Sequence, residues 1–179
     1  SREEDVDRKL DEVIERSRRI DEEILRRDKE VVDEIRKLHK ESTDRLKEVV
    51  DRVDKELKEV KDDKEKLREI LKELREMVRR VEKTDDDISK ELEDLLRESV
   101  RLAEESLKES EELIRKVIEE VKDIEELKKK VTEAIEENRE SVEEIRRHSE
   151  EVKKESEKRV KENRDRARRA EERVEEMLR

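Results

Sequence analysis

The fold is decided by the stretch Val60-Lys61-Asp62-Asp63-Lys64-Glu65, which Val121-Lys122-Asp123-Ile124-Glu125-Glu126 nearly repeats. Each stretch contains an Asp followed three residues later by a Glu, which is the spacing of a helix capping box. The Asp side chain accepts hydrogen bonds from free N–H groups of the first helical turn, and the Glu reaches back to the N–H of the cap. Ser1 and Glu4 have the same spacing. The candidate caps Ser1, Asp62 and Asp123 are 61 residues apart, and they predict three helices of equal length joined by two corners.

The composition favours long helices. Charged residues make up 62% of the 179 residues and apolar residues 28%, and the chain has no aromatic residue, Gly, Pro or Cys. High charge with low hydrophobicity is often a sign of disorder. Here, however, charges of both signs alternate and Leu, Ile and Val recur at helical spacing, which is typical of helical bundles and coiled coils.

The charge and the missing residue types exclude several partners. The net charge of −11 argues against nucleic acid, because there is no surplus of cations to displace counterions from phosphates. Bases would also find no aromatic ring on which to stack. No run of about 18 apolar residues could cross a membrane, and the acidic N-terminus lacks the apolar region of a signal peptide. We therefore expect no nucleic-acid partner and no membrane insertion.

Apolar residues recur in steps of three and four through the segments 2–60, 63–121 and 124–178. In the first segment the seam from Val6 to Val60 covers 54 residues in fifteen steps, a mean of 3.6. A repeat of 3.5 would impose a left-handed supercoil, whereas 3.6 suits nearly straight helices. The sequence therefore predicts an all-α fold: a long, nearly straight up-down-up three-helix bundle that forms a single domain over residues 1–179.

A four-helix bundle with turns near 43, 85 and 130 is the alternative, because Ser42-Thr43-Asp44 and Thr84-Asp85-Asp86-Asp87 also look like helix starts. Folding the chain back on itself distinguishes the two. A corner near residue 61 pairs residues whose numbers add up to 123, so that Val6 meets Val117 and Ser17 meets Ser106. The four-helix arrangement instead sets Ser17 against charged residues. The three-helix bundle is favoured.

The same pairing brings uncharged polar residues to common levels of the bundle. Three layers are expected: Ser17, Ser106 and Ser141; His39, Thr84 and Asn163; and Ile24, Ser99 and His148. A buried donor left unpaired costs about 1–3 kcal/mol, so we expect hydrogen bonds across helices. Such layers fix helix register at a cost in stability. The alternative is that these hydroxyls bond their own helix backbone or lie at the surface.

No catalytic, cofactor-binding or metal site is expected. His39 and His148 would be about fourteen residues, or roughly 20 Å, apart in height, which is too far to share a metal. The sequence has no Cys and no Gly-rich phosphate loop, and straight helices offer no loop that could bind an oxyanion. Burial disfavours the imidazolium form, so the two His predict that stability falls as the pH drops from about 7 to 5.

Taken together, these features resemble the computationally designed, parametric helical bundles with buried hydrogen-bond networks. The resemblance rests on the 61-residue spacing of the caps, the long seams, the Ser and His within them and the Glu/Lys/Arg surface. Corners without Gly depart from it. It implies a structural scaffold with no evolved substrate, no cofactor and no required partner.

Two other functions stay open. One is an interaction module that self-associates or binds a designed helical partner, for which the thin stretch 149–170 would be the groove. The other is a His-based, pH-responsive switch.

Overall fold

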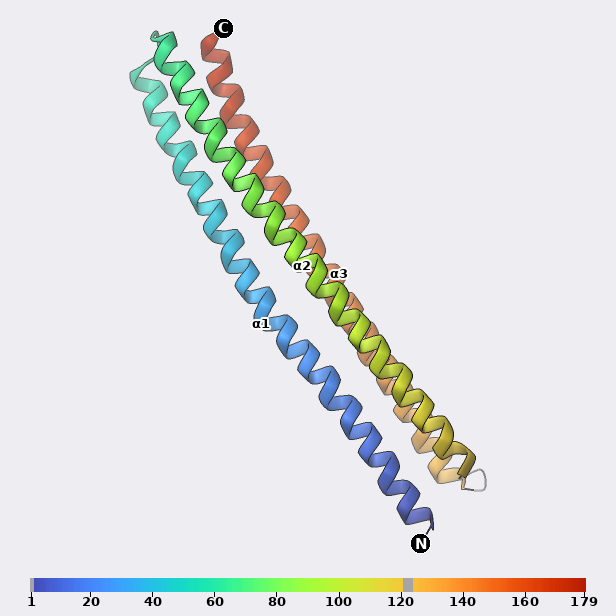
Figure 1. Cartoon of the computed structure of the whole chain (residues 1–179). Coiled ribbons are helices and arrows are strands. Elements are labelled where there is room, and N and C mark those ends of the chain that lie inside the picture. The colour runs from blue at the N-terminus through green and yellow to red at the C-terminus, as the bar shows by residue number, and fades with distance from the viewer. Residues whose placement is uncertain (1, 121–123) are drawn as a thin grey trace. The chain divides into compact units, whose positions relative to one another are not determined.

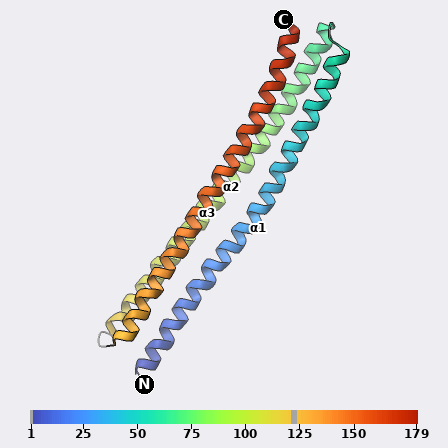
Figure 2. The same cartoon turned by 180° about the vertical axis from the view of Figure 1, so that it is seen from behind.

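The computed structural model describes residues 2–120 and 124–179 of the chain, and it contains three long α-helices (Figure 1). They are α1 (Arg2–Glu59), α2 (Lys64–Glu120) and α3 (Glu125–Leu178). Figures 1 and 2 show by their colours that α2 runs in the opposite direction to α1 and α3. The prediction of an all-α, up-down-up three-helix bundle is confirmed, and the predicted helix ends agree with the described ones to within about one residue.

The four-helix alternative is wrong. Thr43 lies inside α1, Asp85 inside α2 and Lys130 inside α3, where the helical backbone is uninterrupted. Thr43 and Asp85 have the residue types of helix caps, but their side chains bond to other helices instead. Thr43 Oγ1 donates to Asn163 Oδ1, and Asp85 accepts a hydrogen bond from Ser42.

Asp63, one residue later than predicted, caps α2. Its side-chain Oδ1 accepts the backbone N–H of Lys66 at 3.2 Å, and its carbonyl accepts the N–H of Leu67 at 3.0 Å. These are the two bonds of an N-cap residue. The predicted capping box of Asp62 and Glu65 is therefore wrong, because Asp62 lies within the turn that precedes the cap. The candidate caps Ser1 and Asp123 lie outside the described residues.

Contacts between the helices divide the chain into two compact units, each with a segment of all three helices. Unit 1 comprises Ser1–Val31 and Asp94–Glu151, and unit 2 comprises Val32–Glu93 and Val152–Arg179. The expectation of a single domain over residues 1–179 stays a prediction, and the units are described one at a time.

Unit 1 has a core of small apolar clusters, each drawn from all three helices. The buried members are Val6, Val117 and Leu127 in one cluster, Leu10, Ile114 and Val131 in the next, and Ile24, Ala103, Val142 and Ile145 in a third. Steps of three and four residues place a side chain of each helix at each of these levels. Buried polar residues lie between the clusters, and they form part of the candidate site.

Unit 2 contains a large apolar cluster to which α1 and α2 supply leucines, isoleucine and valines, and α3 supplies two alanines and Val174. Leu46, Leu67 and Leu74 are fully buried, and Ala167 and Ala170 pack in the same cluster. Burying each Leu contributes about 1.5–3 kcal/mol. Ala167 and Ala170 end the stretch that we considered as a groove for a partner helix. Leucines of the same unit pack against these two alanines, so that end of the stretch is already covered.

The register predicted by the fold-back rule holds to within about one helical turn. In unit 1, Val6 and Val117 share a cluster, as a residue sum of 123 requires. Asp28 and Ser99 are hydrogen-bonded in the same unit although their numbers add up to 127. In unit 1 the parallel helices α1 and α3 meet at offsets near 120 residues: 119 residues separate Arg18 from Glu137, and 121 separate Ser17 from Asn138.

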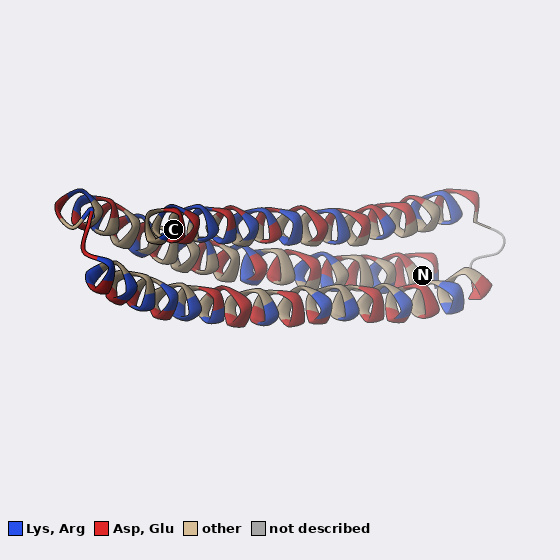
Figure 3. Ribbon diagram, turned by 90° about the horizontal axis from the view of Figure 1, so that it is seen from above, with Lys and Arg blue, Asp and Glu red and all other residues tan. Residues whose placement is uncertain are grey.

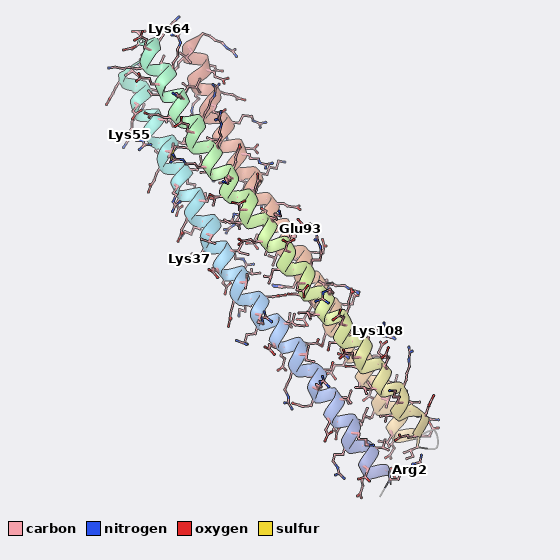
Figure 4. The ribbon with its side chains drawn as sticks, viewed as in Figure 1. Arg2, Lys37, Lys55, Lys64, Glu93 and Lys108 are labelled. Carbon is pink, nitrogen blue, oxygen red and sulfur yellow. The ribbon has the colours of Figure 1, made fainter. Side chains whose placement is uncertain are left out.

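Charged residues cover the outer faces of all three helices, and both signs alternate along each ribbon (Figure 3). Lys37 and Lys55 of α1 and Lys108 of α2 point away from the neighbouring helices (Figure 4). Leu38 and Leu113 are exceptions, because 39% and 41% of their surface is exposed. None of the described helices has a segment both long and apolar enough to cross a membrane.

Candidate functional site

In unit 2, the carboxylate of Asp85 joins all three helices. Asp85 lies on α2 and is 1% exposed. Its Oδ1 accepts a hydrogen bond from Ser42 Oγ of α1 at 3.2 Å, and its Oδ2 accepts one from Asn163 Nδ2 of α3 at 3.0 Å. Asn163 Oδ1 in turn accepts from Thr43 Oγ1 at 3.1 Å. We call Ser42, Thr43, Asp85 and Asn163 the Asp85 network. Its bonds to a charged group are stronger than those between neutral partners.

His39 lies beside this network and is also 1% exposed. Its Nε2 is 3.1 Å from Ser156 Oγ of α3, within hydrogen-bond distance. Its Nδ1 lies 3.5 Å from Asp85 Oδ1 but makes no hydrogen bond to any described residue. The contact with Asp85 is therefore electrostatic, and it is attractive when the imidazole is protonated.

Ser156, His39 and Asp85 have the residue types of a nucleophile, a base and an orienting acid. Three features argue against such chemistry. The acid does not hydrogen-bond the base, and the backbone N–H groups around Ser156 belong to a helix and cannot hold an oxyanion. The hollow next to Ser156 measures about 10 Å³, far below the volume of roughly 300 Å³ or more found for ligand pockets. The three residues therefore lack the geometry of a catalytic triad.

In unit 1, a second polar group surrounds a small pocket between the three helices. Ser17 Oγ of α1 donates to Asn138 Oδ1 of α3, and both residues are buried. Ser110 of α2, Ser141 of α3 and Asp21 of α1 line the same pocket of about 20 Å³. We call this the Asp21 pocket.

Asp21 is the residue of this pocket that has a buried carboxylate oxygen without a hydrogen-bond partner among the described residues. It is 5% exposed, and its Oδ1 makes no hydrogen bond to any residue in the described part of the chain. Burial raises the pKa of its carboxyl group to about 6, because desolvation disfavours the ionised form.

A third polar group of unit 1 joins α1 and α2. Asp28, 1% exposed, accepts a hydrogen bond from Ser99 Oγ. Burial raises the pKa of Asp28, while the bond from Ser99 and the nearby charge of His148 act to lower it. Asp28 Oδ2, like Asp21 Oδ1, makes no hydrogen bond to a described residue, but Asp28 Oδ1 has Ser99 as a partner.

Ion pairs border α3 on both sides. Arg18 binds Glu137 through two hydrogen bonds of 2.9 Å in unit 1, and Arg36 binds Glu155 through bonds of 3.0 and 2.9 Å in unit 2. The mutual hydrogen bond raises the pKa of Arg18 and lowers that of Glu137. On the other side of α3, pairs with α2 include Arg146 with Glu104 and Arg164 with Asp86. Exposed pairs of this kind are worth about 0–1 kcal/mol each.

The structure brings some predicted layer residues together with other partners than expected. Ser17 bonds Asn138, while Ser141 lines the same pocket and Ser106 is buried nearby on α2. His39 and Asn163 both approach Asp85.

For the remaining layer residues the expected neighbours are also replaced. Thr84 is exposed and donates to the carbonyl of Arg80 in its own helix, so it does not meet His39. Ser99 bonds Asp28, which His148 also approaches.

Sequence reasoning missed the three buried aspartates Asp21, Asp28 and Asp85 as site residues. A signal was available for two of them. Asp28 occupies a position of the apolar seam, and Asp85 lies in the seam's gap between Val81 and Ile88, at steps of four and three. Asp21 also lies at steps of four and three, between Ser17 and Ile24, but Ile20 offers an apolar residue for the same turn of the helix, so the sequence favours Ile20 as the buried one.

Comparisons with known proteins give the chain no family. No family model and no curated protein matches the sequence. Among the described residues, no group of three or more His, Asp or Glu side chains is arranged to hold a metal ion. One solved structure that the chain is similar to is described as a "Computationally designed three helix bundle". It is 17% identical, the match covers 98% of this chain and 85% of that one, and the TM-score is 0.31. A likeness that low carries no argument, and the fold described here rests on the chain's own helices and contacts.

Proposed function

We propose that the protein is a structural scaffold without a biochemical activity of its own, in which buried polar groups specify the register of the three helices. The observation that supports this most is the Asp85 network. One carboxylate of α2 receives a hydrogen bond from α1 and another from α3, and all three groups are buried.

A slip of one helical turn would break this arrangement. Moving α3 by four residues in one direction would put Arg159 in place of Asn163 opposite Asp85, which would require the guanidinium to be buried. Moving it in the other direction would put Ala167 there. Ala167 has no donor, so Oδ2 would be buried and unpaired. Removing one partner of a buried charge costs about 3–5 kcal/mol, whereas an apolar layer would penalise the slip much less. The networks therefore select one alignment among several that bury apolar surface.

Distances between spin labels test the register directly. The chain has no Cys, so labels can be attached to Lys37→Cys on α1 and Glu172→Cys on α3, both exposed positions of unit 2. Because Arg36 pairs with Glu155, these labels are separated by about 24 Å along the helix axes, so a slip of α3 along its axis changes the distance between them. We expect one narrow distance distribution in this labelled parent. When Ser42→Ala, Asp85→Leu and Asn163→Leu are added, we expect a broad or double distribution, with components displaced by nearly one turn, about 5 Å.

Thr84→Leu is the matched control, because it adds an apolar side chain at an exposed position beside the network. It should leave the distribution narrow. A distribution that stays single and narrow in the triple variant would show that the polar network does not set the register.

A second candidate function, an interaction module, is favoured by apolar residues along the outer edge between α1 and α2 in unit 1. Leu95, Leu102 and Leu113 of α2 are spaced by 7 and 11 residues, and so are Val13, Ile20 and Val31 of α1. These spacings place each trio on one helix face. All six are partly or largely exposed. We call them the α1–α2 edge, and its occupant would be a second copy of the chain or a designed helical partner with an apolar face.

Light scattering over a range of protein concentrations separates the two functions. A mass that stays at 21.9 kDa supports the scaffold. A larger mass that Leu113→Glu returns to 21.9 kDa supports self-association through the α1–α2 edge, whereas a larger mass unaffected by Leu113→Glu argues against that edge.

A further inference from the structure

The Asp21 pocket contains the functional groups of a cation site. Its polar lining consists of a carboxylate, the hydroxyls of Ser17, Ser110 and Ser141, and the amide of Asn138, together with apolar side chains such as Ile114. Each hydroxyl oxygen has two lone pairs, so it can accept from a guest while its own proton is donated elsewhere, as Ser17 donates to Asn138. Residues of all three helices contribute to this lining.

The charge of Asp21 is not balanced by its surroundings. The charged residues that face the pocket with it are Arg18 of the same helix and Glu137 of α3, and α2 contributes only Ser110 and Ile114 to the lining. Arg18 and Glu137 neutralise each other through their two hydrogen bonds. Burial raises the pKa of Asp21, and no neighbouring cation lowers it again. Above about pH 6 the pocket therefore carries one buried negative charge.

We propose that the Asp21 pocket binds one monovalent cation of about the size of a water molecule, ammonium or a potassium-sized ion. The carboxylate of Asp21 supplies the charge, and the hydroxyl oxygens of Ser17, Ser110 and Ser141 supply further contacts. A guest in this place converts the unpartnered Oδ1 into a paired group, and it neutralises the charge that burial makes costly.

Size and charge select the guest. The pocket of about 20 Å³ has room for one water-sized particle, so a quaternary ammonium such as choline does not fit. A single carboxylate matches a single positive charge, whereas calcium sites in proteins use several carboxylates and six to eight oxygens. Ammonium would donate hydrogen bonds to the same oxygens that would coordinate potassium, and the experiment separates the two.

Thermal unfolding of the full chain in different salts tests the proposal. The melting temperature is measured at about pH 8, where a carboxyl of this kind is ionised, in the chlorides of ammonium, potassium, sodium and choline at equal ionic strength. A guest that binds only the folded protein stabilises it by mass action. We expect ammonium or potassium to raise the melting temperature by about 2–4 °C relative to choline.

Asp21→Asn keeps the shape of the side chain and removes its charge, so the difference between the salts should vanish. Asp28→Asn is the matched control. It removes another buried carboxylate of the same unit, which already has Ser99 as a partner, and it should keep the full difference. The proposal is overturned if the parent melts equally in all four salts, if sodium alone is effective, or if Asp21→Asn retains the effect.

A second measurement does not depend on a variant. Crystals of the unaltered chain grown in rubidium chloride should show an anomalous scattering peak in contact with the Asp21 carboxylate, because rubidium replaces potassium-sized ions. Absence of a peak there, at a rubidium concentration that raises the melting temperature, would place the bound cation elsewhere and overturn the proposal.

Discussion

At the level of single residues, Asp21 makes the folded state sensitive to pH. Its pKa is raised from 3.8 to about 6 in the folded protein because the carboxyl is buried. The folded state therefore binds the proton more tightly than the unfolded chain does. The resulting stabilisation is complete below about pH 4 and is lost as the pH rises through 6.

We predict that Asp21→Asn changes this dependence. Relative to the variant, the parent should become less stable between about pH 4 and pH 8, by at most about 3 kcal/mol, since each pKa unit corresponds to about 1.4 kcal/mol. Urea unfolding at several pH values, in choline chloride so that no small cation is present, gives the free energies. Asp87→Asn, at an exposed position, is the control and should leave the pH dependence of the parent unchanged. Parallel curves for parent and Asp21→Asn would contradict the prediction.

The sequence also predicted a pH effect from the two histidines, of which His39 is buried and His148 is half-buried. The sequence predicted that stability falls from pH 7 to 5 because burial disfavours imidazolium. Asp85 Oδ1, 3.5 Å from His39 Nδ1, attracts that cation, and Asp21 contributes stability in the opposite direction over the same range. The fall in stability from pH 7 to 5 that we expect from the histidines therefore stays a prediction. Comparing the pH dependence of stability in the double His→Ala variant and in its parent would separate the contribution of the histidines from that of Asp21.

The identity of the polar partners could not be read from the sequence because one residue turns a helix by about 100°. Thr84 and Asp85 are neighbours, yet Thr84 is exposed and Asp85 is buried against Asn163. The constant-sum rule gives the level along the bundle to within a turn. It does not give the rotation of each helix about its axis, which decides whether a polar side chain faces a partner or water.

At the level of elements, the apolar seams predicted the three helices and their direction, but not every buried face. Leu38 and Leu113 lie on the seams, three residues after one seam position and four before the next. They are nevertheless 39% and 41% exposed, while His39 and Ile114, one residue further on, are 1% and 2% exposed. Where two consecutive residues of a turn could both face the core, the packing of the neighbouring helices decides which of them is buried.

The corner between α1 and α2 provides a test with a built-in control. Asp63→Ala removes the side chain that accepts the N–H of Lys66, and it should destabilise the protein by about 1 kcal/mol. Asp62→Ala removes the neighbouring carboxylate, which lies in the turn, and it should change stability by less than about 0.5 kcal/mol. Thermal or urea unfolding of both variants measures the difference. A larger loss for Asp62→Ala would restore the capping box that the sequence suggested.

At the level of the whole molecule, the fold could be predicted because it depends on the composition and on the spacing of apolar residues, which can be read directly from the sequence. The absence of Gly and Pro removes the two residue types that are least favourable inside a helix, and the mean apolar step gives the shape of its buried stripe. The buried aspartates could not be predicted in the same way, since 61 of the 179 residues are acidic. Only their burial distinguishes these few from the many at the surface.

Hydrogen exchange at the side-chain amide of Asn163, which donates to Asp85, should report how often unit 2 opens. The Nδ2 hydrogens of Asn163 belong to a side chain that is 2% exposed, so deuterium from the solvent reaches them only when the helices around them part. That opening must separate α3 from α2 at Asp85. The chain has no aromatic ring, so its tertiary structure cannot be followed by fluorescence. The rate of hydrogen–deuterium exchange at the Asn163 side-chain amide instead measures how often this tertiary contact breaks, which backbone amides within long helices report only indirectly.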